Sequence, residues 1–243
     1  MNISRVMPGE GPLFAQVQAV MIQRMLDGHW TPGQCLPSEF ALAAEFEVSQ
    51  GTVRKALDAL ASENLVVRHQ GRGTFVSAHS AQRELYRFFH LVGKDDEQQI
   101  PRTSRLIAFE RRRSTREEAE KLRLPKNAYV ITLQRLRTMD RKPVIIENII
   151  LPVALFEDLA DADEVPNELY QLYEQKYGVT IHKAVEHLTA RATTAEEAKH
   201  LSLAEGAPLL EVDRLAVTLD GTPVEWRVSR CDTRAHSYLS EIV

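Results

Sequence analysis

The chain has 243 residues, of which 44% are hydrophobic and 26% are charged, and its formal net charge is −4. This composition is ordinary for a globular protein, and the length is sufficient for two domains. Because the sequence has neither a run of about 18 apolar residues nor the apolar stretch of a signal peptide, we expect a cytoplasmic protein with no membrane partner.

The cysteines and histidines indicate neither a disulfide framework nor a metal site. The only cysteines, Cys35 and Cys231, lie far apart without a CxxC partner, and the 8 histidines show no HExxH or similar spacing. We therefore expect no metal and no other cofactor.

The first expected element is a helix that Pro12 opens and Gly28 ends. Leu13, Val17 and Met21 recur on one side of it at helical spacing. This apolar stripe predicts a support helix that packs against the segments that follow.

Two helices separated by a tight turn come next. Ser38 is placed to cap a short helix, whose apolar spacing stops at Glu47. Ser49 is placed to cap a second helix, which Asn64 ends.

Two short strands are expected after the second helix, over residues 65–67 and 74–76. The tip between them, RHQGRG, carries two glycines and two arginines. Helix, turn, helix and hairpin in this order predict a winged helix-turn-helix, and such a tip can lie on a phosphate backbone or enter a minor groove.

Polar side chains remain on the outer side of the second helix, at Gln50, Thr52, Arg54 and Lys55. Amide, hydroxyl and guanidinium groups there can reach base edges or phosphates in a DNA groove. The alternative is an ordinary solvated helix face.

The motif LPSE, a spacer and VSQGTVRKALDALASENLVVRHQGRGTFV resemble the DNA-binding domain of GntR-family bacterial transcription regulators over residues 10–77. The resemblance implies DNA contacts in the second helix and the wing, and the expected DNA-binding set is Ser38, Ser49, Gln50, Thr52, Arg54, Lys55, Arg68, Gly71 and Arg72. Many members have Arg at the positions of Phe40 and Gln50. Because Phe40 cannot bind phosphate or guanine, we expect a shifted or relaxed operator sequence.

The expected DNA-binding region is not basic as a whole. Residues 1–80 contain six Lys and Arg against seven Asp and Glu. The positive charge is local instead, at Arg54, Lys55, Arg68 and Arg72. Few phosphate contacts imply a modest affinity for one copy. Two copies on two half-sites bind more tightly, so we expect a homodimer.

An internal repeat marks the second domain. We expect a linker and a first strand over residues 78–100, the strand at 86–92, and a second domain over 101–243. Within it, STREEAEKLRL recurs 79 positions later as TTAEEAKHLSL, and a β-hairpin pattern follows each copy. Capping boxes are expected for Ser114 with Glu117 and for Thr194 with Glu197.

The fold class is therefore α+β, with an N-terminal winged helix-turn-helix joined to an antiparallel sheet domain that contains the repeat. We expect helices on one side of the sheet and a pseudo-two-fold relation between its halves. Further strands are expected over 104–111, 129–138 and 179–192, and further helices over 156–160 and 168–177.

Charged residues alternate with apolar ones along the expected strands. Arg135 and Arg137 share a strand face, Glu147 lies on the next strand, and Glu225 and Arg227 share a face of the last. Paired arginines suit a phosphate or carboxylate because each guanidinium fork bonds two oxygens. Alternatively, the arginines form a solvated face and Glu147 neutralises Arg135 across the hairpin.

The motifs QRLRTMDRKPVIIENIILP, LYEQKYGV and LLEVDRLAVTLDGTPVEWRVSR are similar to the UTRA effector-sensing domain of the HutC branch of GntR regulators, whose fold resembles chorismate lyase. The resemblance implies ligand contacts at Arg135, Arg137, Glu147 and Glu225, and Arg227 completes the expected effector-binding set. The C-terminal RCDTRAHSYLSEI departs from the aromatic-rich pattern of several members, and Tyr238 is a candidate for the missing aromatic residue.

Together these patterns predict a homodimeric transcription repressor that binds double-stranded operator DNA under the control of a small anionic metabolite, either a phosphorylated sugar or a carboxylate. The alternative is a metabolite-processing enzyme with an attached DNA-binding domain. Because the sequence has no GxSxG motif, catalytic carboxylate pair or Walker loop, we expect no enzymatic activity. An architectural DNA binder without an effector is a weaker alternative.

Overall fold

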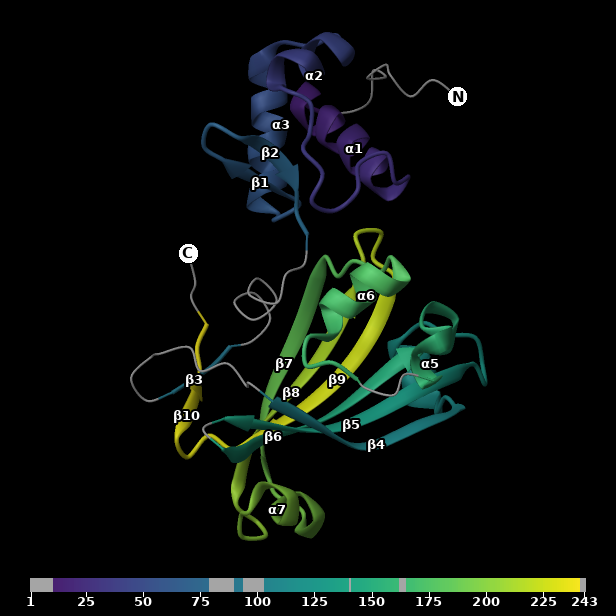
Figure 1. Ribbon diagram of the computed structural model, residues 1–243, viewed down its shortest axis with the longest axis vertical. Coiled ribbons are helices and arrows are strands. Elements are labelled where there is room, and N and C mark those ends of the chain that lie inside the picture. The colour runs from purple at the N-terminus through teal and green to yellow at the C-terminus, as the bar shows by residue number, and fades with distance from the viewer. Residues whose placement is uncertain (1–10, 79–89, 94–102, 140, 162–164, 241–243) are drawn as a thin grey trace. The chain divides into compact units, whose positions relative to one another are not determined.

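The computed structural model describes residues 11–78, 90–93, 103–139, 141–161 and 165–240. The chain forms two compact units, Met1–His79 and Ser80–Val243 (Figure 1). Within the described ranges, no helix is long and apolar enough to cross a membrane.

The first unit is a winged helix-turn-helix, as the sequence predicts. Its elements are α1 (Leu13–Leu26), α2 (Glu39–Glu45), α3 (Gln50–Ser62), β1 (Val66–His69) and β2 (Gly73–Val76). Its core holds Val17 and Met21 of α1, Leu42 of α2 and Leu57 of α3. The apolar stripes of the three helices therefore face one another.

Both expected helix caps of this unit are confirmed. The Ser38 hydroxyl accepts a hydrogen bond from the backbone N–H of Ala41 at 3.1 Å, and that of Ser49 accepts one from Thr52 at 3.1 Å. These caps satisfy backbone donors that the first turn of a helix leaves without a partner. They fix where α2 and α3 begin.

The wing is a tight antiparallel hairpin in which His69 lies opposite Gly73. The backbone N–H of Arg72 donates to the His69 carbonyl at 3.0 Å and closes the turn. Gly71 has φ 71° at the tip, a left-handed conformation that glycine adopts without strain. The glycine at this position therefore determines the shape of the wing.

The second unit is built on a six-stranded antiparallel sheet in the order β4-β5-β6-β9-β8-β7. The strands are β4 (Thr103–Arg113), β5 (Tyr129–Met139), β6 (Lys142–Pro152), β7 (Lys183–Ala192), β8 (Pro208–Val217) and β9 (Pro223–Cys231). The helices are α5 (Arg116–Lys121), α6 (Leu169–Tyr177) and α7 (Ala195–Leu201), with 3-10 turns η1 (Val153–Leu155) and η2 (Glu157–Asp161). A separate two-stranded ribbon joins β3 (Leu91–Gly93) to β10 (His236–Tyr238).

The strand order contains the predicted pseudo-two-fold. β4, α5, β5 and β6 form one half, and β7, α7, β8 and β9 form the other in the same sequence. The halves meet where β6 pairs with β9, and the register there places Asn148 opposite Val228. These two residues are 80 positions apart, as are all equivalent residues after the hairpins, so the pseudo-axis passes through this pair.

The second expected capping box is confirmed and the first is shifted by one residue. Thr194 and Glu197 form a capping box at α7, but at α5 the partners are Thr115 and Glu118, not Ser114 and Glu117. The shift has a physical cause. Glu118 also accepts two hydrogen bonds from Arg112, so one carboxylate joins the helix start to β4, as Glu197 joins α7 to Arg191.

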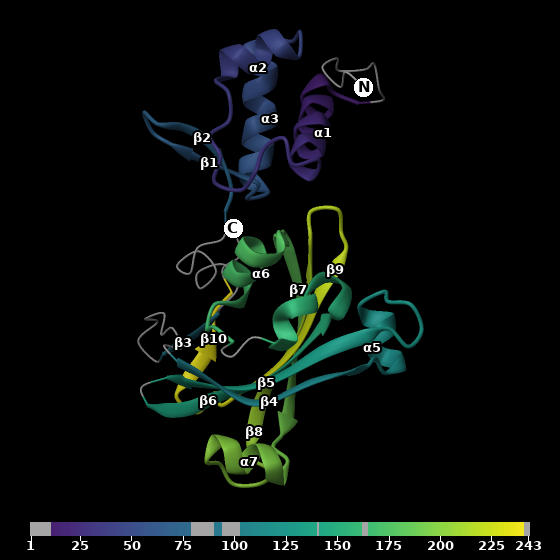
Figure 2. The same ribbon diagram turned by 45° about the vertical axis from the view of Figure 1, so that its right-hand side comes forward.

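The expectation of helices on one side of the sheet is wrong. Leu169 and Tyr173 of α6 pack with Ile131 of β5, whereas Leu122, which ends α5, packs with Val130 on the opposite face. Leu201 of α7 covers that opposite face too. The central strands are apolar on both faces, so both faces need cover (Figure 2).

Several boundaries also differ from those expected. The helix expected over 156–160 consists of 3-10 turns, and the strand expected from residue 179 begins at Lys183. The first strand, β3, is confined to Leu91–Gly93 among the described residues. The rest of the expected segment 78–100, at 79–89 and 94–100, lies outside those residues.

Candidate functional site

The outer side of α3 carries four of the residues predicted to bind DNA. Gln50, Arg54 and Lys55 are exposed, and Thr52 is half-buried. The Thr52 hydroxyl lies 2.9 Å from that of Ser49. The hydroxyls of Ser38 and Ser49 already cap helices, so both serines are held in fixed conformations.

Glu39 joins three of the predicted residues and was missed by the sequence analysis. Its carboxylate accepts hydrogen bonds from Arg54, with Nη2 at 2.9 Å, and from the Gln50 amide at 3.5 Å, and it pairs with Arg68 of β1 at 3.5 Å. The bonds from Arg54 lower the pKa of Glu39. Glu39 lies 15 positions before Arg54 and 29 before Arg68 in the sequence, so no local pattern indicates these contacts.

The wing residues divide into two groups. Arg68 lies in β1 and pairs with Asp58 of α3 at 2.7 Å as well as with Glu39. Gly71 and Arg72 form the exposed tip. The predicted DNA-binding residues thus lie at the starts of α2 and α3, along α3, on β1 and at the wing tip of one unit.

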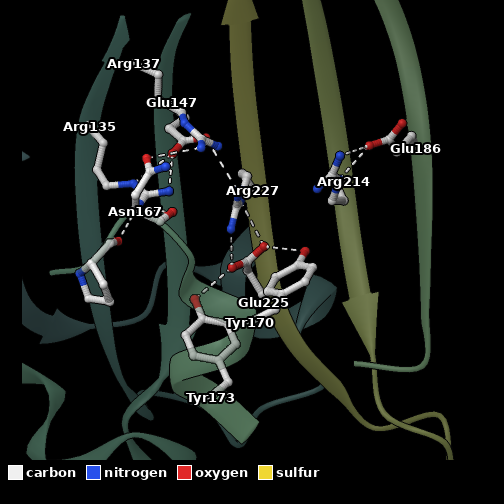
Figure 3. Close-up of polar contacts among 11 residues, drawn as sticks. Arg135, Arg137, Glu147, Asn167, Tyr170, Tyr173, Glu186, Arg214, Glu225 and Arg227 are labelled. Carbon is white, nitrogen blue, oxygen red and sulfur yellow. Dashed lines mark hydrogen bonds and ion pairs between the residues drawn. The ribbon is translucent and has the colours of Figure 1, made fainter. Parts of the chain in front are cut away.

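The five predicted effector residues all project from one face of the second-unit sheet, here termed the cavity face. Strand pairing places Arg135 opposite Glu147, and Arg214 opposite Arg227 (Figure 3). Arg227 bridges Glu225, with Nη2 at 2.8 Å, and Glu147, with Nη1 at 3.6 Å. The charged side chains of both halves therefore form one continuous network.

Two predicted effector residues, Arg135 and Glu225, are buried and hydrogen-bonded to other groups of the protein. Arg135 is 1% exposed and bonds Glu147 through Nε at 2.8 Å and the Pro166 carbonyl through Nη1 at 2.9 Å. Glu225 is fully buried and accepts bonds from the hydroxyls of Tyr170 and Tyr173, in addition to Arg227. These two residues hold the network together, and neither belongs to the lining of the cavity beside it.

A cavity of about 40 Å³ opens beside this network, between the sheet and the β3–β10 ribbon. Its lining consists of His90, Leu91, Arg137, Ile145, Glu147, Val212, Arg214, Arg227, Ser229, Cys231 and Tyr238. Since a cavity needs roughly 10–15 Å³ to hold one water molecule, there is room for a few water-sized groups.

The cavity lining includes residues that the sequence analysis did not select. Arg214 pairs with Glu186 at 2.5 Å, and Glu186 also accepts a bond from the Tyr238 hydroxyl. The ring of His90 lies 5.2 Å from that of Tyr238. The repeat could have identified Arg214, because it is the equivalent of Arg135, 79 positions earlier.

The charges around the cavity do not cancel. The network beside the cavity contains four arginines and three glutamates, which leaves an excess of one positive charge: Arg135, Arg137, Arg214 and Arg227 against Glu147, Glu186 and Glu225. Although burial alone raises the pKa of Glu147, the charges of Arg135, Arg227 and Arg137 hold it at about 2.

Two further lining residues are held neutral by their surroundings. Burial lowers the pKa of His90 and raises the pKa of the Cys231 thiol to about 12. The excess positive charge therefore stays in place at neutral pH, and it suits an anionic group. In the part of the chain that the structure describes, no cluster of three or more His, Cys, Asp or Glu side chains could hold a metal ion.

Comparison with known proteins gives two family matches. Residues 13–76 match the model of bacterial regulatory proteins of the gntR family, and residues 97–237 match the UTRA domain. The first match contains the winged helix-turn-helix, and the second contains the cavity lining except His90, Leu91 and Tyr238.

Individual relatives cover most of the chain. It is 30% identical to the HTH-type transcriptional repressor NagR of Bacillus subtilis over 93% of this chain and 91% of the relative. It is 27% identical to a probable fructoselysine utilization operon transcriptional repressor of Escherichia coli, over 87% of each chain. A crystal structure of the ligand-binding domain of a GntR-family regulator from Bordetella bronchiseptica is similar with a TM-score of 0.59 and 31% identity, over 65% of this chain and 99% of that one.

Proposed function

The chain belongs to the gntR family of bacterial regulatory proteins and carries a UTRA domain, and from this we infer that it is a DNA-binding transcription repressor under metabolite control. We propose that the controlling ligand is a small anion and that it binds in the cavity of the second unit. The observation that carries the proposal is the convergence of Arg137, Arg214 and Arg227 on that cavity, where positive charge is in excess.

The size of the cavity bears on the class of ligand. Its volume of about 40 Å³ suits the charged end of a molecule rather than a whole sugar. A guanidinium group binds phosphate and carboxylate through two parallel hydrogen bonds. A phosphorylated sugar or a carboxylate is therefore the proposed effector, with its remainder extending beyond the cavity.

On the DNA side, we propose that α3 enters the major groove and the wing tip lies on the phosphate backbone. Gln50, Thr52 and Arg54 then reach base edges or phosphates, and Arg72 contacts phosphate. Because few basic side chains serve one copy, binding to an operator requires a homodimer on two half-sites. We place this repressor in the cytoplasm, where the operator is, and propose no enzymatic activity.

A melting-temperature screen of the full-length protein tests the effector site. We expect phosphorylated sugars, small carboxylates or inorganic phosphate at millimolar concentration to stabilise the protein, and Arg137→Met to abolish this effect. The substitution leaves no carboxylate stranded, because Glu147 keeps Arg135 and Arg227 as partners. Arg105→Met is the matched control, since Arg105 is exposed and lies opposite Leu136, away from the cavity face.

Different outcomes separate the candidate functions. Equal stabilisation of both variants by every anion would contradict the cavity assignment. Consumption of the stabilising compound by the protein would favour an enzyme with an attached DNA-binding domain. Release or tightening of operator DNA by a compound that is not consumed would support the repressor.

A further inference from the structure

Phe40 is the most exposed large hydrophobic residue in the described part of the chain. Its side chain is 76% exposed, and the next, Leu13, is 55% exposed. Phe40 is the second residue of α2, a helix that buries Leu42 and Ala43 in the core. The ring therefore contributes almost nothing to the core of its own unit, and an exposed aromatic group of this size suits contact with a partner.

The position of Phe40 in the first unit indicates that this partner is DNA. The preceding residue, Glu39, binds Arg54 of α3 and Arg68 of β1 at the same carboxylate. These two elements are the recognition helix and the wing of the proposed function, on which the inference rests. Phe40 therefore lies at the point where α2 approaches the surface that faces DNA.

The chemistry of phenylalanine limits what it can recognise there. A phenyl ring neither donates nor accepts a conventional hydrogen bond, so it cannot distinguish bases by their polar edges. The 5-methyl group of thymine is the apolar group that the base edges present in the major groove. We infer that Phe40 is a specificity-determining residue that contacts a thymine methyl group in each half-site of the operator.

Deoxyuridine substitution tests this contact directly, because it removes the methyl group and leaves the base pairing intact. Operator duplexes are first selected from a random library by the full-length protein, and each thymine is then replaced singly. Since burial of one methyl group is worth about fourfold in affinity, we expect a loss of about fourfold at one or two thymines in each half-site. In Phe40→Ala, the same replacements should have no effect, because the contact is already lost.

Leu26→Ala is the matched control, since Leu26 is also an exposed apolar residue but lies at the end of α1, outside α2, α3 and the wing. It should retain the full thymine dependence. Tolerance of deoxyuridine at every position by the unmodified protein would overturn the role of Phe40 and leave the repressor proposal intact. Enrichment of no sequence from the library would overturn both.

Discussion

The Glu147 carboxylate makes its ion pairs with Arg135 and Arg227 only when the second unit is folded. Its pKa is about 2 in the folded protein, against an ordinary value of 4.5. A lowered pKa means that the unfolded chain binds the proton more tightly. The stabilisation by Glu147 is therefore complete above about pH 4.5 and is lost as the pH falls toward 2.

Glu147→Gln should consequently destabilise the protein in a pH-dependent way. Removing one partner of a buried ion pair costs roughly 3–5 kcal/mol, so we expect a loss of that order in the free energy of unfolding at pH 7. The difference from the unmodified protein should shrink below pH 4.5. Urea unfolding at a series of pH values measures it. Glu157→Gln, at an exposed position, is the control and should change little at any pH. A difference that stays constant down to pH 3 would refute the assignment.

At the scale of single elements, the start of α5 can be tested against its sequence-based expectation. Loss of a helix cap costs about 1 kcal/mol, and we expect this loss for Thr115→Ala. Ser114→Ala should be close to neutral, because within the described residues its buried hydroxyl has no hydrogen-bond partner. Chemical denaturation of the two variants gives both values. A cost of about 1 kcal/mol for Ser114→Ala, with none for Thr115→Ala, would place the cap at Ser114 instead.

The elements themselves could largely be predicted, because their signals are local. The caps at Ser38 and Ser49 and the wing turn depend on residues close together in the sequence, and the repeat is visible by comparing the sequence with itself. Even the correction at α5 was accessible, since subtracting 79 from Thr194 gives Thr115. The buried charge network beside the cavity could not be predicted from such local signals. Glu225 is enclosed by tyrosines that lie 55 and 52 positions earlier, and their docking depends on the packing of α6 onto the sheet.

At the scale of the whole molecule, the two units have separate cores. Leu57 is 1% exposed in the core of the first unit, and the second unit has its own core around Ile131 and Tyr173. Truncation of a buried leucine to alanine costs about 2–5 kcal/mol. Substitutions in separate cores act independently when they share no contacts.

Leu57→Ala should therefore lower the unfolding temperature of the first unit alone. In calorimetry we expect a second transition that keeps its temperature and its response to anions. The matched substitution Ile131→Ala should do the opposite. A single transition that shifts as a whole in both variants would show that the units unfold together.

Glu147 and Arg227 occupy equivalent positions in two copies of one sequence unit, on either side of the Asn148–Val228 pair, yet they carry opposite charges. If the second unit arose by duplication of one half, the ancestral copies bore identical side chains at these positions. Divergence at one of them replaced like groups with an ion pair. It also made the two sides of the cavity unequal, since the later copy lines it with Arg214 and Arg227, whereas the earlier copy contributes Arg137 and Glu147. If the proposed effector carries a single anionic end, we therefore expect it to bind in one favoured orientation.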